Sequence, residues 1–105
     1  MAKNFIDFEK IEKLTEQDKD ISNEFRIIKL QEEVGELSAA FLKYKKISNS
    51  SASSNGSREH VLEELCDVLN VTLDLINAFE FDDKESKIMF DKKLLKWEKK
   101  VINRV

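Results

Sequence analysis

The chain has 105 residues, of which 37% are charged and 41% hydrophobic, with no proline, two glycines and a formal net charge of −3. This profile predicts a single all-α domain over residues 1–105 with one modest core. Cys66 is the only cysteine, and no segment resembles a signal peptide or a membrane span. A disulfide framework and a membrane protein are therefore excluded, and we expect a cytoplasmic location.

The first two predicted helices span approximately residues 4–18 and 22–46. The first has a short apolar stripe that begins with Phe5 and Phe8. Ser22 or Asn23 is the expected N-cap of the second. Six apolar residues of the second helix recur at spacings of three and four, which predicts a core-facing stripe. They are Ile27, Leu30, Val34, Leu37, Phe41 and Tyr44.

A serine-rich, low-complexity stretch follows at residues 48–57. It contains almost nothing to bury, so we expect a flexible loop. Neither flanking half has enough apolar surface to fold alone. The stretch is therefore interpreted as a connector within one domain.

The third predicted helix starts at residue 57 or 58 and ends near residue 79. After a turn at residues 81–83, with Asp82 or Asp83 as N-cap, the fourth spans about residues 84–103. Apolar residues cover more than half of the third helix's circumference at 100° per residue. Such a helix has to be covered on several sides. We therefore expect a four-helix bundle-like chain that assembles into a homo-oligomer, a dimer or a tetramer.

The charge is distributed unevenly. Residues 84–105 hold eight basic and three acidic residues, a net charge of +5, whereas residues 1–83 hold ten and eighteen, a net charge of −8. A basic C-terminal helix can bind nucleic acid, receive phosphates or form a solvated face. Nucleic-acid binding is the weakest of the three, because acidic residues dominate elsewhere and no reading motif is present.

Two helical segments share an acidic pattern that reads Glu, apolar, small, acidic, apolar. The segments are residues 33–37 and 64–68. Each supplies two carboxylates at i,i+3 spacing, on one side of its helix. The four are Glu33, Glu36, Glu64 and Asp67. If the two helices face each other, these side chains form an oxygen-rich site for a hard divalent cation.

The helical phase places Glu33 and Glu64 at the margins of apolar faces, where an unpaired carboxylate is costly. Gly35 lies in the first pattern, and a glycine inside a helix costs about 1 kcal/mol relative to alanine. It suggests a close neighbour or a ligand that needs room. His60 lies outside the register and is interpreted as a surface residue, so the all-oxygen donor set favours Mg²⁺, or Mn²⁺ as a substitute.

These segments, with the sequence around them from residue 29 to residue 69, resemble the MazG-like all-α nucleoside triphosphate pyrophosphatases. Dimeric dUTPases and dCTP pyrophosphatases belong to the same superfamily. Its signature is Glu-x-x-Glu on one helix and Glu-x-x-Asp on the next, separated by a variable loop. The four-helix layout extends the likeness to most of the chain.

The resemblance implies a Mg²⁺-dependent enzyme that hydrolyses a (d)NTP at the α-phosphorus to a (d)NMP and pyrophosphate. Glu33, Glu36, Glu64 and Asp67 would hold the metal and form the catalytic centre. The metal would neutralise phosphate charge and lower the pKa of an attacking water. One carboxylate would also orient or deprotonate that water, and the sequence leaves open which one.

The resemblance also implies substrate contacts outside the acidic pattern. Basic residues on the last helix would bind the phosphate tail, and Lys93, Lys96 and Lys100 match that arrangement. Some relatives have an asparagine at the position of Trp97. The base pocket would be apolar and aromatic, built by the first helix or a partner subunit, and its candidates are Phe5 and Phe8. Asn70 either contacts the nucleotide or extends a polar strip.

A second class of function fits the same residues. The chain can be a non-catalytic helical module for oligomerisation or partner binding, with its carboxylates in salt bridges between subunits. Substitution of Asp67 by asparagine separates the two, because a polar network tolerates that change and a metal site does not.

Overall fold

The computed structural model describes residues 5–46 and 56–104, and every regular element in these ranges is an α-helix. The elements are α1 (Phe8–Gln17), α2 (Asn23–Lys45), α3 (Arg58–Ala78) and α4 (Asp83–Asn103). The predicted all-α class is confirmed. The predicted flexible loop at 48–57 lies outside the described residues, except for its last two.

Each helix begins at a side chain that caps it, because oxygen acceptors satisfy backbone N–H groups that have no partner within the helix. The carboxylate of Asp7 accepts from the N–H of Lys10, so α1 begins several residues later than expected. Two caps agree with the prediction, Ser22 for α2 and Asp82 for α4. Ser57 caps α3, which begins at Arg58 as expected.

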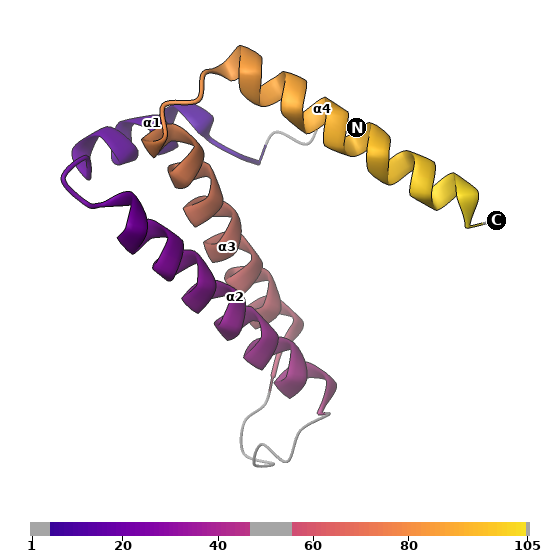
Figure 1. Cartoon of the computed structure of the whole chain (residues 1–105). Helices are drawn as coiled ribbons and strands as arrows, with labels where there is room; N and C mark the ends of the chain where they lie inside the picture. The colour runs from indigo at the N-terminus through magenta and orange to yellow at the C-terminus, as the bar shows by residue number, and fades with distance from the viewer. Residues whose placement is uncertain (1–4, 47–55, 105) are drawn as a thin grey trace.

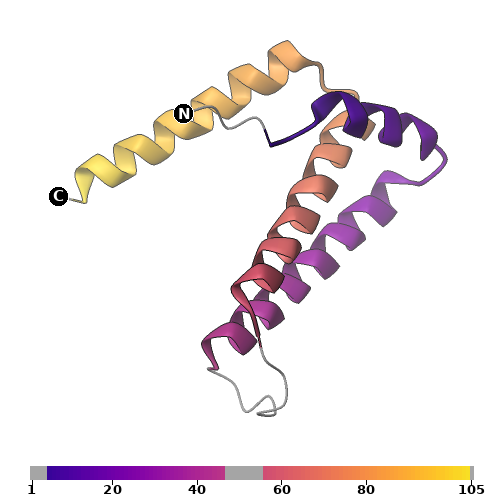
Figure 2. The same cartoon turned by 180° about the vertical axis from the view of Figure 1, so that it is seen from behind.

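Helices α2 and α3 form a long antiparallel pair, and α1 crosses the end of the pair where α3 finishes (Figures 1 and 2). Extensive helix packing in the described chain is confined to α2 against α3 and α1 against α3. Helix α4 projects away from the pair. The single chain therefore does not close the expected four-helix bundle, and its first three helices form an open arrangement.

The turn between α3 and α4 explains the direction of α4. Glu80 adopts a left-handed conformation with φ 63°. The N–H of Glu80 donates to the carbonyl of Asn77 and that of Phe81 to the carbonyl of Ile76, the pattern of a Schellman turn. The rings of Phe79 and Phe81 stack with centroids 5.8 Å apart. The turn is therefore a defined structure that ends α3 and redirects the chain.

The chain buries little apolar surface. Ala40 is the one hydrophobic residue that is buried among the described residues, and α3 and α4 contain no buried residue. The predicted stripe of α2 is only partly covered: Ile27, Val34 and Phe41 are each about 44–45% exposed. The buried face of α2 is instead rotated toward Glu33 and Ala40, because α3 packs there.

None of the helices in residues 5–46 and 56–104 has an apolar stretch of the length needed to cross a membrane.

Candidate metal centre

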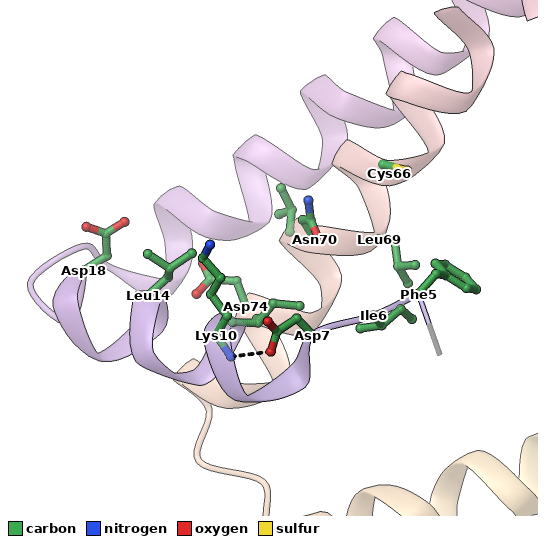
Figure 3. Close-up of a pocket in the computed structure, with 12 residues that line it drawn as sticks. Phe5, Ile6, Asp7, Lys10, Leu14, Asp18, Cys66, Leu69, Asn70 and Asp74 are labelled. Atoms are coloured by element: carbon green, nitrogen blue, oxygen red, sulfur yellow. Dashed lines mark hydrogen bonds between the residues drawn. The ribbon is translucent and has the colours of Figure 1, made fainter. Parts of the chain in front are cut away.

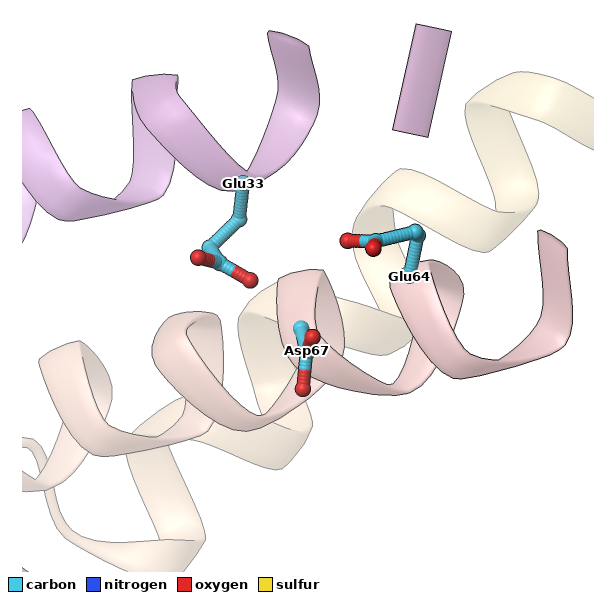
Figure 4. Close-up of side chains that lie close together, drawn as sticks. All are labelled: Glu33, Glu64 and Asp67. Carbon is cyan, nitrogen blue, oxygen red and sulfur yellow. The ribbon is translucent and has the colours of Figure 1, made fainter. Parts of the chain in front are cut away.

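Three of the four predicted ligands converge between α2 and α3. One carboxylate oxygen from each of Glu33, Glu64 and Asp67 lies within 4.8 Å of the others. Figure 4 shows Glu33 reaching from α2 toward α3, and Glu64 and Asp67 presented by successive turns of α3. The i,i+3 spacing on α3 and the antiparallel packing of the two helices produce this convergence.

Burial distinguishes two of these carboxylates from ordinary surface acids, whereas Asp67 is exposed. Glu33 is 6% exposed, and the side chain of Glu64 is 12% exposed. Oε2 of Glu64 is buried and has no hydrogen-bond partner among the described residues. Such an atom is costly unless a cation or a proton satisfies it. Burial, followed by the negative charges of Glu36 and Asp67, raises the pKa of Glu64.

Two basic side chains border the cluster. The ammonium of Lys29 lies 3.6 Å from Oε1 of Glu33, one helical turn away. Nε2 of His60 lies 3.8 Å from Oε1 of Glu64, and its Nδ1 lies 3.4 Å from Oε2 of Glu63. The imidazole is half exposed, as a surface residue would be, but it lies at the edge of the cluster. A positive charge on this imidazole lowers the pKa of Glu64 and so opposes the upward shift.

The remaining predicted site residues lie outside this group of three. Glu36 is exposed, although its charge acts on Glu64, so its part in binding stays a prediction. Lys93, Lys96 and Lys100 are exposed on α4, which does not pack on α2 or α3. The single chain therefore does not bring these lysines onto the acidic cluster.

A pocket of about 530 Å³ lies between α1, the residues just before it, and α3. Its wall includes the apolar side chains of Phe5, Leu14 and Leu69, and the polar side chain of Asn70 (Figure 3). Phe8 is not part of this wall. The pocket shares α3 with the acidic cluster, because Asn70 lies one turn beyond Asp67.

A buried polar network that the sequence reasoning missed holds α1 in place. Arg26 is 4% exposed, and its Nε donates to Oδ2 of Asp74 at 2.8 Å. Its two terminal nitrogens donate to the carbonyls of Asp18 and Ile21. The hydroxyl of Thr15 donates to Oδ1 of Asp74 at 2.6 Å. The network therefore joins α1, the turn after it, α2 and α3.

The acidic pattern of residues 33–37 and 64–68 predicts neither this network nor the ion pair of Lys29 with Glu33. Arg26 directly precedes the predicted apolar stripe of α2, so the sequence alone predicts an exposed charged residue at this position. The i,i+4 spacing of Lys29 and Glu33 is a signal that could have been used.

The chain matches no model of a known protein family, and no curated protein or solved structure is significantly similar to it. The likeness to the MazG-like superfamily therefore rests on the acidic motif and the helical layout alone.

Proposed function

We propose that this protein is a Mg²⁺-dependent nucleoside triphosphate pyrophosphohydrolase, which converts a (d)NTP to a (d)NMP and pyrophosphate. One observation carries the proposal. Three carboxylates from two helices converge, Glu33 is buried and Asp67 is exposed, and one oxygen of Glu64 is buried without a partner among the described residues. An acidic cluster alone is common on protein surfaces, whereas a buried carboxylate oxygen without a partner favours a bound cation or a proton.

The donor set fits magnesium. Glu33, Glu64 and Asp67 would hold the ion, with Glu36 as a further ligand, and oxygen donors suit Mg²⁺ or Mn²⁺. The bound metal would supply charge neutralisation at the phosphates and a water of lowered pKa. The contribution of the protein is to hold the carboxylates in place, through the packing of α2 on α3.

The neighbouring pocket and the basic helix supply the other parts of a nucleotide site. The apolar wall that includes Phe5 suits a base, and Asn70 offers an amide at its edge. Lys93, Lys96 and Lys100 would contact the phosphate tail in a homo-oligomer, where α4 has another subunit to meet. A single cysteine is compatible with work in the reducing cytoplasm, where nucleotide pools lie.

The non-catalytic oligomerisation module remains a second candidate, because a specific observation favours it. The chain exposes many large apolar side chains, such as Phe90 and Trp97 of α4. Such surfaces indicate association with a partner. This reading does not explain the buried, unpartnered oxygen of Glu64, so we place it second.

The test is an assay of pyrophosphate release from a panel of NTPs and dNTPs, with and without Mg²⁺. We expect at least one nucleotide to be cleaved, and only with the metal. Glu64→Gln and Asp67→Asn should each lower the rate at least about 100-fold, since even partners of metal ligands contribute 10- to 100-fold. Glu63→Gln is the matched control, because this exposed neighbour lies on the same helix. Cleavage that survives both substitutions would refute the proposal.

A further inference from the structure

Helix α4 carries an apolar face that nothing in the described chain covers. Phe90, Leu94, Trp97 and Val101 recur at helical spacing and are between 43% and 66% exposed. The Schellman turn after α3 directs this helix away from the rest of the molecule (Figure 1). An amphipathic helix held apart from its own chain needs a cover from elsewhere.

The α2–α3 pair has bare apolar rows of its own. Ile27, Val34 and Phe41 lie seven residues apart along α2, and each is about 44–45% exposed. On α3, Leu62 and Leu65 are 59% and 48% exposed. The apolar surface of the α2–α3 pair is therefore not covered by a further helix, and the apolar face of α4 is not packed on any surface of the described chain.

The charges of the two surfaces are complementary. Helix α4 has seven basic and four acidic residues, a net charge of +3, and α3 has one basic and five acidic residues, a net charge of −4. Opposite charges on two apolar surfaces favour their contact. One chain therefore carries both halves of an interface, and its own fold keeps them apart.

The exposed area is large enough for such an interface. The chain exposes 9016 Å², whereas a compact monomer of 12.3 kDa exposes about 6,100 Å². The radius of gyration is 16.9 Å, compared with about 13 Å for a compact domain of this length. The excess of about 2,900 Å² per chain suffices for an obligate dimer, which buries about 2,000–5,000 Å² in total.

We propose that α4 of one copy lies along the α2–α3 pair of a second copy, and reciprocally, in a two-fold symmetric dimer. The exchange covers the α4 stripe and gives each α2–α3 pair the additional helix that its own chain does not supply. A different protein would have to match both surfaces, whereas a second copy matches both at once. The dimer does not depend on the proposed reaction. If that reaction holds, the lysines of α4 would serve the acidic cluster of the partner copy.

Trp97 is the only tryptophan of the chain, so its fluorescence reports on the α4 face directly. We would measure the mass by light scattering, and the quenching of Trp97 by acrylamide, over a dilution series of the full chain. We expect a mass of two copies with a shielded indole at high concentration. On dilution, the mass and the shielding should fall together. Four copies with the same shielding would also support the α4 contact.

Leu94→Gln tests the face itself, with Lys92→Gln on the opposite side of α4 as the matched control. We expect Leu94→Gln to raise the dissociation constant more than about tenfold, since burial of one leucine is worth about 1.5–3 kcal/mol. Lys92→Gln should change it by less than about threefold. A 12.3 kDa species at all concentrations, or a dimer with freely quenched Trp97, would overturn the proposal. Equal effects of the two substitutions would also overturn it. Loss of pyrophosphatase activity alone would not.

Discussion

Ionisation of the carboxylate of Glu64 is costly, because Oε2 is buried without a partner in the described chain. Burial, and then the charges of Glu36 and Asp67, raises the pKa of Glu64 above its ordinary value of 4.5. The folded chain thus binds this proton more tightly than the unfolded chain. This contribution to stability is complete below pH 4.5 and is lost as the pH rises through the folded-state pKa.

We therefore predict that Glu64→Gln removes this fall in stability. In EDTA at neutral pH, the variant should have a larger free energy of unfolding than the wild type. Urea unfolding at a series of pH values measures both effects, and Glu63→Gln is the control, because its side chain is exposed. A wild-type profile that is no steeper than that of Glu64→Gln would contradict the prediction.

Lys29 competes with a cation for Glu33. Its ammonium lies 3.6 Å from Oε1 of that carboxylate, and its side chain is 46% exposed, so solvent screens the pair partly. Removal of this positive charge should tighten Mn²⁺ binding about three- to tenfold in Lys29→Met. Calorimetric titration measures the affinity, with Lys13→Met on α1 as the control. Weaker binding in Lys29→Met would instead show that the lysine positions Glu33 for the metal.

Among the helices, the position of α1 depends on the hydrogen bonds of one carboxylate, that of Asp74. Asp74 of α3 binds both Arg26 of α2 and Thr15 of α1. Asp74→Ala leaves the buried guanidinium without its carboxylate and should cost about 3 kcal/mol in the free energy of unfolding. Asp91→Ala breaks an exposed pair with Lys87 and should cost less than about 1 kcal/mol. Similar costs, measured by urea unfolding, would show that the buried contact does not hold α1.

Apart from its chain neighbours and the backbone of its own helix, no atom of the described residues lies within 4 Å of the position that a Cβ of Gly35 would occupy. The close neighbour expected from the sequence is therefore absent from the described chain. Gly35→Ala should stabilise α2 by about 0.5–1 kcal/mol, because alanine loses less conformational freedom in a helix. Thermal unfolding of the two proteins at equal concentration measures the change. Destabilisation would show that a second copy or a ligand packs at this position.

Across the whole molecule, the sequence predicted the features that depend on residues a few positions apart. Helical periodicity located the four helices of the described residues, and cap residues located the starts of α2 and α4, because both signals act within a few residues. The matched spacing of Glu33, Glu64 and Asp67 predicted their convergence once the helices are antiparallel. The prediction of which face of α2 meets α3 was wrong. The observed face contains Glu33 and Ala40 and is less apolar than the predicted stripe, so apolar periodicity did not indicate it.

Features that join distant parts of the chain left no such signal. Arg26 and Asp74 are 48 residues apart, so no periodicity links them. The projection of α4 depends on the left-handed conformation of Glu80, which glycine adopts more readily than glutamate. The predicted homo-oligomer stays a prediction, which the bare apolar surfaces of α2, α3 and α4 support.

Analysis of the reaction products tests the proposed function most directly. The full chain is incubated with the nucleotide that it cleaves best and with Mg²⁺, and the products are separated by ion-exchange chromatography. Hydrolysis at the α-phosphorus yields nucleoside monophosphate and pyrophosphate in equal amounts, and none without the metal. Nucleoside diphosphate and phosphate as products, or no turnover of any NTP or dNTP with Mg²⁺ or Mn²⁺, would contradict the proposal.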